Sequence, residues 1–339
     1  MATIKDVARL AGVGVGTASR VVSGNGSVAP ETAQRVRQAI ADLNFRPSHA
    51  ARTLLSGSSQ MIGVYIPVLK GTFYTPLLSA IDHELRLSGR HMVVAFGSGD
   101  GNTHEQAMKG IEFLIERGCD GVVVMSNAMN EDDLLSLGPK REALVFLNHH
   151  VDAIDEQCFT IDHERGGILA AQALLKNGHR KFAVIGGPQD TVDNLARLKG
   201  FHEELARAGI GGTDVLALSS DFSPEGGWAS ARSLISSGHS FTALFCANDE
   251  MAIGALAFCH QAGIGVPANI SVLGYDDIQS AEFSAPQLTT VHIPWRQLTL
   301  SGLRWLLNRC YREQLPVVRH LLPSITWRAS VGPAPDGTA

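Results

Sequence analysis

Hydrophobic residues near the start of the chain recur with the period of an α-helix. Within Ile4–Ala11 the apolar side chains are spaced i, i+3, i+4 and i+7, which gives the first predicted helix one apolar face. Thr3 and Asp6 have the Thr-x-x-Asp spacing of a capping box, so this helix is expected to begin directly after Thr3. Gly12 is of the residue type that most often ends a helix. The pattern therefore predicts a short amphipathic helix followed by a glycine turn.

A second short helix is predicted from about Val15. Its Ala18 and Val21 can face inward, whereas Val15, Gly16 and Arg20 can face outward. A helix, a turn that contains glycine and a second helix with an exposed arginine form the pattern of a helix-turn-helix, whose second helix enters the DNA major groove. An ordinary αα-hairpin is the alternative for this stretch taken alone.

A third helix is predicted to follow. Pro30 suits its first turn, and Ala33, Val36, Ile40 and Leu43 would form its apolar face. Three helices with apolar faces can share one small core, which an isolated helical hairpin does not have.

Four motifs complete this pattern: IKDVARLAGV, TASRVV, ETAQRV and the hinge pattern Phe45-x-Pro47-Ser48-x-x-Ala51-Arg52-x-Leu54. With these motifs in this order, the segment resembles the headpiece of the LacI/GalR family of bacterial transcription regulators, and the resemblance extends over nearly all 339 residues. It implies a palindromic double-stranded DNA operator as partner, and a homodimer that places two headpieces on it. The residues expected to contact DNA are Thr3, Val15, Gly16, Thr17, Arg20, Asn25, Ser48, Arg52 and Leu54.

Two glycines depart from the family's pattern. The family usually has Ser at the position of Gly14, and Gly caps a helix within a few tenths of a kcal/mol of Ser. Gly16 costs about 1 kcal/mol relative to Ala inside a helix and supplies no side chain that could contact a base. Direct readout is therefore expected mainly from Arg20, with help from Thr17, while Val15 offers only apolar contact, for example to a thymine methyl group.

The hinge after the three helices is expected to fold only on DNA. The stretch SHAARTLL is too short to form a stable helix alone, and it begins with Ser48 where Asn is commoner in the family. Leu54 is predicted to wedge into the minor groove at the central step, because such apolar wedges kink DNA towards the major groove. The following SGSSQ is predicted to be a short flexible linker.

After this linker the hydrophobic pattern changes. Apolar runs of strand length alternate with helical patterns at residues 76–88, 104–117, 165–176, 195–208 and 250–262. This alternation predicts βαβ units, and so an α/β core with parallel sheets that are covered on both faces. The predicted strands are MIGVYIP, HMVVAFG, GVVVMS, ALVFLN, FAVIGG, ALFCAN and SVLGYD.

The family resemblance implies how these elements are arranged. It predicts an all-α helix-turn-helix headpiece joined to a two-lobed, periplasmic-binding-protein-like core with three crossings between the lobes. Residues 151–155 look like the end of the first lobe, and Pro286–Pro294 like a return crossing. The predicted parts are a headpiece (1–46), a hinge helix and linker (47–59), an effector-binding and dimerisation core (60–332) with an N-lobe at about 60–160 and 293–318 and a C-lobe at about 161–292 and 319–332, and a flexible tail (333–339).

Polar and aromatic residues follow several of the predicted strands. Ligands of open parallel sheets bind beyond the carboxyl ends of the strands, where Asn and Asp can bind vicinal hydroxyls and aromatic rings can stack on a sugar. For each Asn or Asp, the alternative is that it caps the following helix. The strand-end positions are Phe73, Tyr74, Ser126, Asn127, Asn248, Asp249, Asp276 and Asp277.

The resemblance adds further candidates. Arg197, in NLARLKGF, stands where the family has its effector-binding arginine, and either Phe222 or Trp228 would be the stacking ring of an aromatic loop. Asp162 matches a position near the effector in several members. The expected effector-binding residues are Phe73, Tyr74, Asn127, Asp162, Arg197, Phe222, Trp228, Asn248 and Asp276.

These residues favour a neutral sugar or sugar derivative as effector, because carboxylates accept hydrogen bonds from hydroxyls and repel polyanions. Arg197 leaves a sugar phosphate or a sugar acid open. The resemblance implies a repressor of a carbohydrate uptake or catabolism operon that an inducer releases from DNA. The alternatives are a family member that needs a non-sugar co-repressor, and a two-lobed sugar-binding protein with no role on DNA.

Charge is distributed unevenly along the chain. Residues 1–57 hold seven Lys and Arg against three Asp and Glu, a net charge of +4, whereas the whole chain carries −5 and the remainder therefore −9. A basic head on an acidic body is expected of a DNA-binding module attached to a regulatory domain. The C-terminal SVGPAPDGTA lacks the heptads of a zipper, so a dimer is expected rather than a zipper-linked tetramer.

Composition and motifs argue against other classes of protein. No apolar run has the length of a membrane span, no signal peptide precedes the first helix, and the five cysteines form no C-x-x-C pair, so a reduced cytoplasmic protein is expected. The Gly12-x-Gly14-x-Gly16 spacing follows a helix and not a strand, which is the wrong context for a dinucleotide loop. We therefore expect no enzymatic activity, no catalytic residue, no cofactor and no metal.

Overall fold

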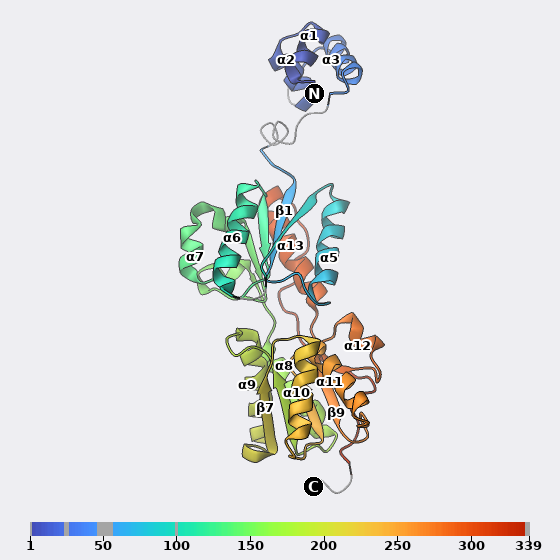
Figure 1. Ribbon diagram of the computed structural model, residues 1–339. Helices are drawn as coiled ribbons and strands as arrows, with labels where there is room; N and C mark the ends of the chain where they lie inside the picture. The colour runs from blue at the N-terminus through green and yellow to red at the C-terminus, as the bar shows by residue number, and fades with distance from the viewer. Residues whose placement is uncertain (1, 24–26, 46–56, 99–100, 336–339) are drawn as a thin grey trace.

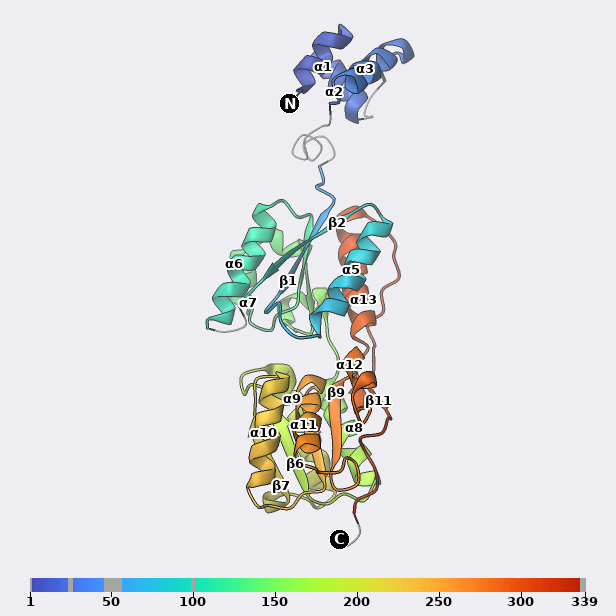
Figure 2. The same cartoon turned by 45° about the vertical axis from the view of Figure 1, so that its right-hand side comes forward.

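The computed structural model describes residues 2–23, 27–45, 57–98 and 101–335. Figure 1 shows a unit of three helices followed by two α/β lobes, and Figure 2 shows the same arrangement from a second side. Among the described residues, no helix combines the length and the apolar character needed to cross a bilayer.

The N-terminal unit contains α1 (Ile4–Ala11), α2 (Val15–Ser23) and α3 (Pro30–Asp42). The predicted capping box is present: the backbone N–H of Thr3 donates to Asp6 Oδ2 at 2.9 Å, and that of Asp6 donates to Thr3 Oγ1 at 3.4 Å. Gly12 ends α1 in the left-handed region, with φ of +67°. The core that the three helices share consists of Val7, Ala8, Ala11, Ala18, Val36 and Ala39.

The first lobe, here called the N-lobe, is built on a five-stranded parallel sheet in the order β2-β1-β3-β4-β5. Helices α5 and α13 pack on one face of this sheet, and α6 and α7 lie over the other (Figure 1). Its elements are β1 (Met61–Ile66), α5 (Tyr74–Leu87), β2 (His91–Phe96), α6 (Thr103–Glu116), β3 (Gly121–Val124), α7 (Glu131–Ser136), β4 (Leu144–Leu147), β5 (Cys158–Phe159) and α13 (Trp295–Tyr311).

The second lobe, the C-lobe, has a six-stranded sheet in the order β11-β10-β9-β8-β6-β7, in which β10 and β11 pair antiparallel and the other pairs are parallel. Helices α8 and α9 pack on one face, and α10 and α11 on the other. Its elements are α8 (His163–Lys176), β6 (Phe182–Gly186), α9 (Val192–Arg207), β7 (Val215–Ser219), α10 (Pro224–Ser236), β8 (Ala243–Cys246), α11 (Asp249–Gln261), β9 (Ser271–Asp276), α12 (Gln279–Phe283), β10 (Thr289–His292) and β11 (Ser324–Thr326).

The chain passes between the lobes three times, after β5, after β10 and after α13, which confirms the predicted two-lobed architecture. All seven predicted strands are present, but β5, β7, β10 and β11 were not predicted. The interpretation of Pro286–Pro294 as a crossing is wrong in part, because Thr289–His292 forms β10 inside the C-lobe sheet. Strand β7 has the apolar run VLAL, but it lies at the sheet edge and most of its side chains are exposed.

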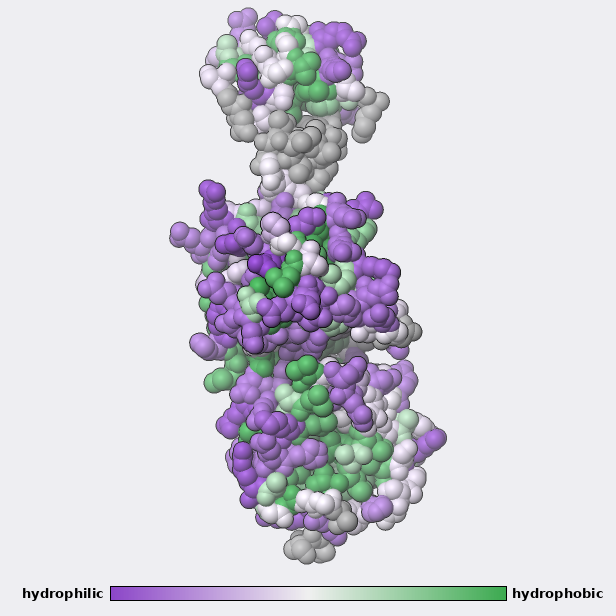
Figure 3. Space-filling model, turned by 90° about the vertical axis from the view of Figure 1, so that its left-hand side faces the viewer, coloured by the Kyte–Doolittle hydropathy of each residue, from purple (hydrophilic) through white to green (hydrophobic). Residues whose placement is uncertain are grey.

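The surface of the C-lobe exposes several large apolar side chains. Val192 and Leu195 of α9 are 64% and 51% exposed, and Leu218 of β7 is 37% exposed. Figure 3 faces the side on which α9 and β7 lie, and it shows hydrophobic groups that interrupt the hydrophilic surface of this lobe.

The predicted flexible linker SGSSQ is instead held to the N-lobe in its described part. The Asp120 carboxylate accepts hydrogen bonds from Ser58 Oγ at 2.6 Å and from the backbone N–H groups of Ser59 and Gln60, each at 2.8 Å. It also accepts from the Tyr311 hydroxyl at 2.8 Å, at the end of α13. Burial works to raise the pKa of Asp120, but these hydrogen bonds outweigh it and lower the pKa. One carboxylate thus anchors the start of the core to its last N-lobe helix.

Candidate recognition helix and ligand site between the lobes

Helix α2 has the exposure expected of a recognition helix. Ala18 is fully buried, whereas Val15 is 45% exposed and Arg20 is exposed. Gly14 directly precedes the helix, and its carbonyl accepts a hydrogen bond from the Ala18 backbone N–H at 3.1 Å. A Cβ added at Gly16 would meet no atom within 4 Å, so this position is open for contact with a DNA groove.

The other predicted DNA contacts lie partly outside the described residues. Thr3 is exposed at the start of α1, and Thr17 is half-buried in α2. The predicted roles of Asn25, Ser48, Arg52 and Leu54 concern residues outside the described ranges, so they stay predictions.

A buried arginine lies on the C-lobe side of the boundary between the lobes. The Arg197 guanidinium donates from Nη1 to the Ala247 carbonyl at 2.6 Å and from Nη2 to Asp193 Oδ2 at 2.8 Å. Its Nη2 is also 3.7 Å from Asp276 Oδ1, and the guanidinium lies 4.2 Å from the centre of the Tyr275 ring. Burial opposes its charge, but the carboxylates of Asp276 and Asp193 outweigh burial and raise the pKa of Arg197.

The position of Arg197 depends on close packing of α8 against α9. A Cβ at Gly167 of α8 would lie 2.0 Å from the Arg197 carbonyl oxygen, which is far inside any real contact. Only glycine therefore allows α9 to approach closely enough to bring Arg197 to the end of β9.

Asp276 ends strand β9 in a sparsely populated backbone conformation, with φ of +107°. Its Oδ1 accepts a hydrogen bond from Trp295 Nε1 at 3.2 Å. Burial raises the pKa of Asp276 to about 7; Arg197 acts in the opposite direction, and Asp193 adds to the increase. The carboxyl is therefore poised to change its protonation near neutral pH.

Asn248 has the capping role that its position allowed, and its amide nitrogen holds the neighbouring loop. Its Oδ1 caps α11 by accepting from the Met251 backbone N–H at 2.9 Å, and its Nδ2 donates to the Phe222 carbonyl at 2.9 Å. Phe222 has φ of +64°, and its ring centre is 6.0 Å from the Arg197 guanidinium. The sequence left the stacking ring open between Phe222 and Trp228, and the structure brings Phe222 to the arginine.

Trp228 and Asp162 make their ring contacts and hydrogen bonds outside this cluster, although the charge of Asp162 helps to raise the pKa of Tyr275. The Trp228 ring packs edge-on against Phe258 at 5.4 Å between α10 and α11, with the Arg232 guanidinium over its face. Asp162 is exposed and caps α8, where its Oδ1 accepts from the Arg165 backbone N–H at 2.8 Å. Both residues thus have local contacts, and their predicted roles in effector binding stay predictions.

The N-lobe contributes aromatic and amide groups. The Phe73 ring packs edge-on against Tyr74 at 5.0 Å and against Trp295 at 5.1 Å. Burial, together with the carboxylates of Asp193 and Asp276, raises the pKa of Tyr74. Its hydroxyl therefore stays protonated at neutral pH.

Sequence reasoning missed four residues of this cluster: Asp193, Asn148, His163 and Trp295. Asp193 accepts from Asn127 Nδ2 at 3.4 Å and from Asn148 Nδ2 at 3.2 Å. The spacing of Asp193 and Arg197, i and i+4 on one helix, was a signal that could have found the pair. Asn148 directly follows β4, so the strand-end rule could have found it. His163 and Trp295 had no such signal, because they begin the helices that follow two of the crossings.

His163 is a neutral connector within the cluster. Its Nδ1 is 2.9 Å from the Tyr275 hydroxyl, and its Nε2 is 2.5 Å from Asn148 Oδ1. Burial lowers the pKa of His163 to about 3, with the nearby Arg197 acting in the same direction. Its imidazole therefore carries no charge near neutral pH.

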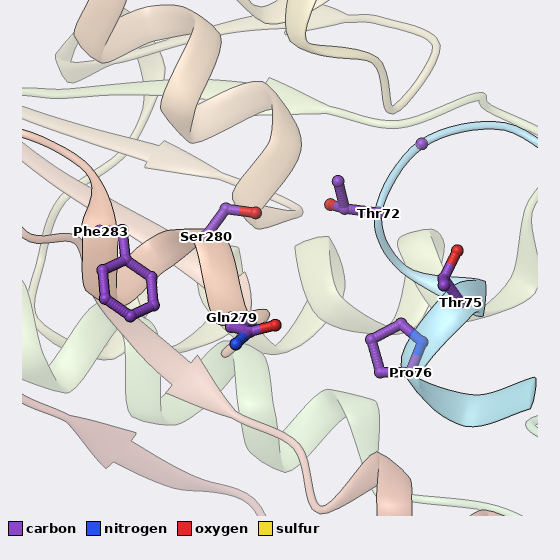
Figure 4. A pocket seen from close by; sticks show the side chains of 7 residues that line it. Thr72, Thr75, Pro76, Gln279, Ser280 and Phe283 are labelled. Atoms are coloured by element: carbon purple, nitrogen blue, oxygen red, sulfur yellow. The ribbon is translucent and has the colours of Figure 1, made fainter. Parts of the chain in front are cut away.

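A groove opens at the rim of the same boundary (Figure 4). One wall comes from the loop before α5 and its first turn, the other from α12. Beside it, Thr72 donates from its backbone N–H and its hydroxyl to Glu250 Oε1 at 2.6 and 2.7 Å. The residues that line the groove are Gly71, Thr72, Thr75, Pro76, Gln279, Ser280 and Phe283. None of the predicted effector residues is among them.

Comparison with known proteins agrees with this architecture. Residues 3–48 match the model of bacterial regulatory proteins of the lacI family, and residues 171–331 match a periplasmic binding protein-like domain. The HTH-type transcriptional regulator GalR of Escherichia coli K12 is 30% identical over 332 residues, which cover 98% of this chain and 96% of GalR.

Three solved structures extend the comparison. The lac repressor dimer bound to operator and the anti-inducer ONPF is 28% identical with a TM-score of 0.82, covering 98% of this chain and 99% of that one. A LacI-family transcriptional regulator from Burkhoderia phymatum is 48% identical with a TM-score of 0.77, covering 80% and 99%. The complex of the transcriptional regulator CelR with cellobiose is 30% identical with a TM-score of 0.66, covering 97% and 100%. The chain belongs to the lacI family of bacterial regulatory proteins and is a DNA-binding transcriptional regulator.

Proposed function

We propose that this regulator is a repressor whose affinity for its operator falls when a sugar-type ligand binds between the lobes. The observation that carries the proposal is the cluster around Arg197, where carboxylates, amides and an arginine lie together beside the Phe222 ring. Sugar hydroxyls both donate and accept hydrogen bonds, so they can satisfy such a mixed set of groups. The cellobiose found in the CelR complex supports the same ligand class.

The proposed change of affinity follows from the position of this cluster. A ligand can shift the affinity for DNA only if it prefers one arrangement of the lobes over another. The cluster joins residues of both lobes, so its occupancy depends on how the lobes meet. By linkage, operator must weaken sugar binding by the same factor by which sugar weakens operator binding.

The proposal includes a homodimer on a palindromic operator. One recognition helix reads one half-site, so a palindrome needs two headpieces related by a two-fold axis. The lac repressor structure on operator is a dimer, which supports the same assembly here. Large exposed apolar side chains, Phe96 at the end of the edge strand β2 and Phe283 of α12, are candidates for the subunit interface.

The test has two parts. Selection from a random duplex library should recover a palindrome, and the logarithm of the affinity for it should fall with log salt by about 0.9 per phosphate contacted. Calorimetry of the full chain against mono- and disaccharides, with and without that operator, should then identify a ligand whose binding is weaker in the presence of the operator.

Three outcomes would contradict the proposal. A selection that recovers no palindrome would contradict the proposal that a homodimer binds a palindromic operator. A ligand whose binding operator strengthens would make it a co-repressor and reverse the sign. If no sugar binds, the proposed ligand class is wrong.

A further inference from the structure

We infer that Asp193 determines which ligand charge the cleft accepts, and that its carboxylate holds the two lobes together in the ligand-free protein. This inference rests on the proposed binding of a ligand between the lobes. It assigns to the cleft an uncharged polyol as ligand and excludes sugar acids and sugar phosphates, which Arg197 alone had left open.

The Asp193 carboxylate contacts both lobes at once. It lies in the first turn of α9 in the C-lobe, where its Oδ2 accepts from Arg197 Nη2 at 2.8 Å. From the N-lobe, Asn148 donates to Oδ2 at 3.2 Å and Asn127 donates to Oδ1 at 3.4 Å. These two asparagines follow β4 and β3. One side chain therefore accepts hydrogen bonds from three groups that could otherwise bind a ligand.

The charges around Arg197 disfavour an anion. The side chains of Arg197, Asp193 and Asp276 are 4%, 12% and 7% exposed, so one buried guanidinium faces two buried carboxyl groups. Glu250 also contributes negative potential at Asp276. Water screens charges poorly at such sites, and an added carboxylate or phosphate would meet two carboxyl groups beside the single guanidinium. Hydroxyl groups carry no such penalty, and they can donate to both carboxylates.

In the ligand-free protein, Asp193 occupies hydrogen-bond donors that a ligand could use. The amides of Asn127 and Asn148 now donate to its carboxylate, and a hydroxyl oxygen of a polyol could accept the same hydrogen bonds. A bound polyol would then replace the carboxylate as the connection between the lobes. Other polar links between the lobes include the Thr72–Glu250 contact at the rim, the bond from Trp295 Nε1 to Asp276 and the contact of Asn148 with His163. Asp193 differs from them because its one carboxylate accepts from two N-lobe residues.

Two substitutions separate charge from bridging. Asp193→Asn removes the charge but keeps an oxygen that can accept a hydrogen bond. Asp193→Ser removes the charge and shortens the side chain, so that it no longer reaches the N-lobe. Asp190→Asn is the matched control, because Asp190 is an exposed carboxylate three residues earlier in the chain.

The first measurement is calorimetry on the full chain with matched probes: a hexose that binds, the hexuronate of the same configuration and its 2-amino analogue. The wild type should prefer the hexose over the hexuronate by at least about tenfold, and Asp193→Asn should lower that preference by at least about tenfold. Asp190→Asn should leave it unchanged. A wild type that binds the hexuronate as tightly as the hexose, or a preference unchanged in Asp193→Asn, would overturn the assignment of charge selection. A wild type that binds the amino sugar more tightly than the hexose would overturn the assignment of an uncharged ligand.

The second measurement needs no ligand. Hydrogen–deuterium exchange of the full chain should become faster in Asp193→Ser at residues 125–130 and 147–150, the loops that carry Asn127 and Asn148, and should stay unchanged in Asp190→Asn. Equal exchange in all variants would overturn the bridging role. If exchange changes as expected but no sugar binds to the wild type, the bridge stands and the proposed ligand class falls, so the two failures are distinguishable.

Discussion

The N-lobe and the C-lobe are similar in architecture, but they bring different chemistry to the cleft between them. The C-lobe contributes the charged groups Arg197, Asp193 and Asp276, and each of them is largely buried. The N-lobe contributes aromatic and amide groups, Phe73, Tyr74, Asn127 and Asn148. Ionic contacts within the cleft are therefore internal to the C-lobe, whereas uncharged donors of the N-lobe bond to carboxylates of the C-lobe.

This difference suggests that the C-lobe mainly determines ligand affinity and the N-lobe mainly determines lobe closure. A buried guanidinium needs fixed partners, and the close packing of α8 on α9 gives it a rigid position in the C-lobe. Hydrogen bonds to a charged group contribute about 1.5–3 kcal/mol each. When the lobes separate, Asp193 keeps its ion pair with Arg197, so no unpaired charge is exposed. We expect substitutions in the C-lobe to change ligand affinity strongly, and substitutions in the N-lobe to change lobe closure with a smaller loss of affinity.

The largest effect is expected for Asp276→Ala. It removes hydroxyl acceptors and leaves Trp295 Nε1 without its acceptor, so ligand affinity should fall by about 3 kcal/mol, roughly a hundredfold. Operator affinity should be retained, which would leave a repressor that no longer responds. Calorimetry and gel shifts on the same preparation measure both quantities. Ligand affinity close to that of the wild type would show that the C-lobe carboxylate does not contact the ligand.

The next effect is a dependence of ligand binding on pH. Burial raises the pKa of Asp276 to about 7, and hydroxyl donors stabilise its ionised form, so affinity should rise with pH and level off above about 7. Below that pH the change should approach, at most, about tenfold per pH unit. The charged groups that act on Asp276 are Arg197, Asp193 and Glu250, and His163 remains neutral because its pKa is lowered to about 3.

Calorimetry at several pH values checks this prediction, with Asp276→Asn as the variant in which the dependence should vanish. Folding stability responds with the opposite sign. Because the native pKa is raised, the contribution of Asp276 is fully present below about pH 4 and is lost as the pH rises through about 7. Ligand affinity that does not vary with pH would show that Asp276 does not exchange its proton on binding.

A smaller effect is expected on the N-lobe side. Asn148→Ala should weaken ligand binding by about 1 kcal/mol, roughly fivefold, because it removes one neutral hydrogen bond. Asn127→Ala should lower the affinity by a similar amount, since its amide can donate to a ligand hydroxyl in the same way. Calorimetry with the same sugar measures both. If either substitution lowers ligand affinity as much as Asp276→Ala does, the proposal that the C-lobe contributes more to ligand affinity than the N-lobe is wrong.

The smallest effect on the ligand is expected at the junction with the DNA-binding unit. Asp120→Asn weakens the anchor of Ser58–Gln60 far from the cluster, so ligand affinity should not change measurably. Hydrogen exchange at Ser59 and Gln60 should become faster, and operator affinity should fall because the linker is less ordered. Tyr311→Phe removes one of the donors to Asp120 and should show the same pattern more weakly. A change in ligand affinity in either variant would contradict this prediction, because it would show that the Asp120 anchor influences the cleft.

The sequence by itself determined the elements and the family. The capping box at Thr3, the glycine at the end of α1 and the apolar faces of α1–α3 are local patterns, so three helices could be predicted within a residue or two. The alternation of apolar runs and helical patterns predicted two parallel sheets, and family motifs picked out Arg197, Asn248 and Asp276. These features depend on residues that are close together along the chain.

The tertiary structure decided which of these residues meet. Asp162 and Trp228 have local contacts, while His163 meets Tyr275, which lies 112 residues further along the chain. Asn148 meets Asp193 across the lobe boundary over 45 residues. Periodicity fixes the face of a helix or strand on which a side chain lies, but three crossings of the chain decide which faces oppose each other. The partners of Arg197 therefore exist only once the C-lobe has folded, and the anchor at Asp120 exists only once the N-lobe has folded.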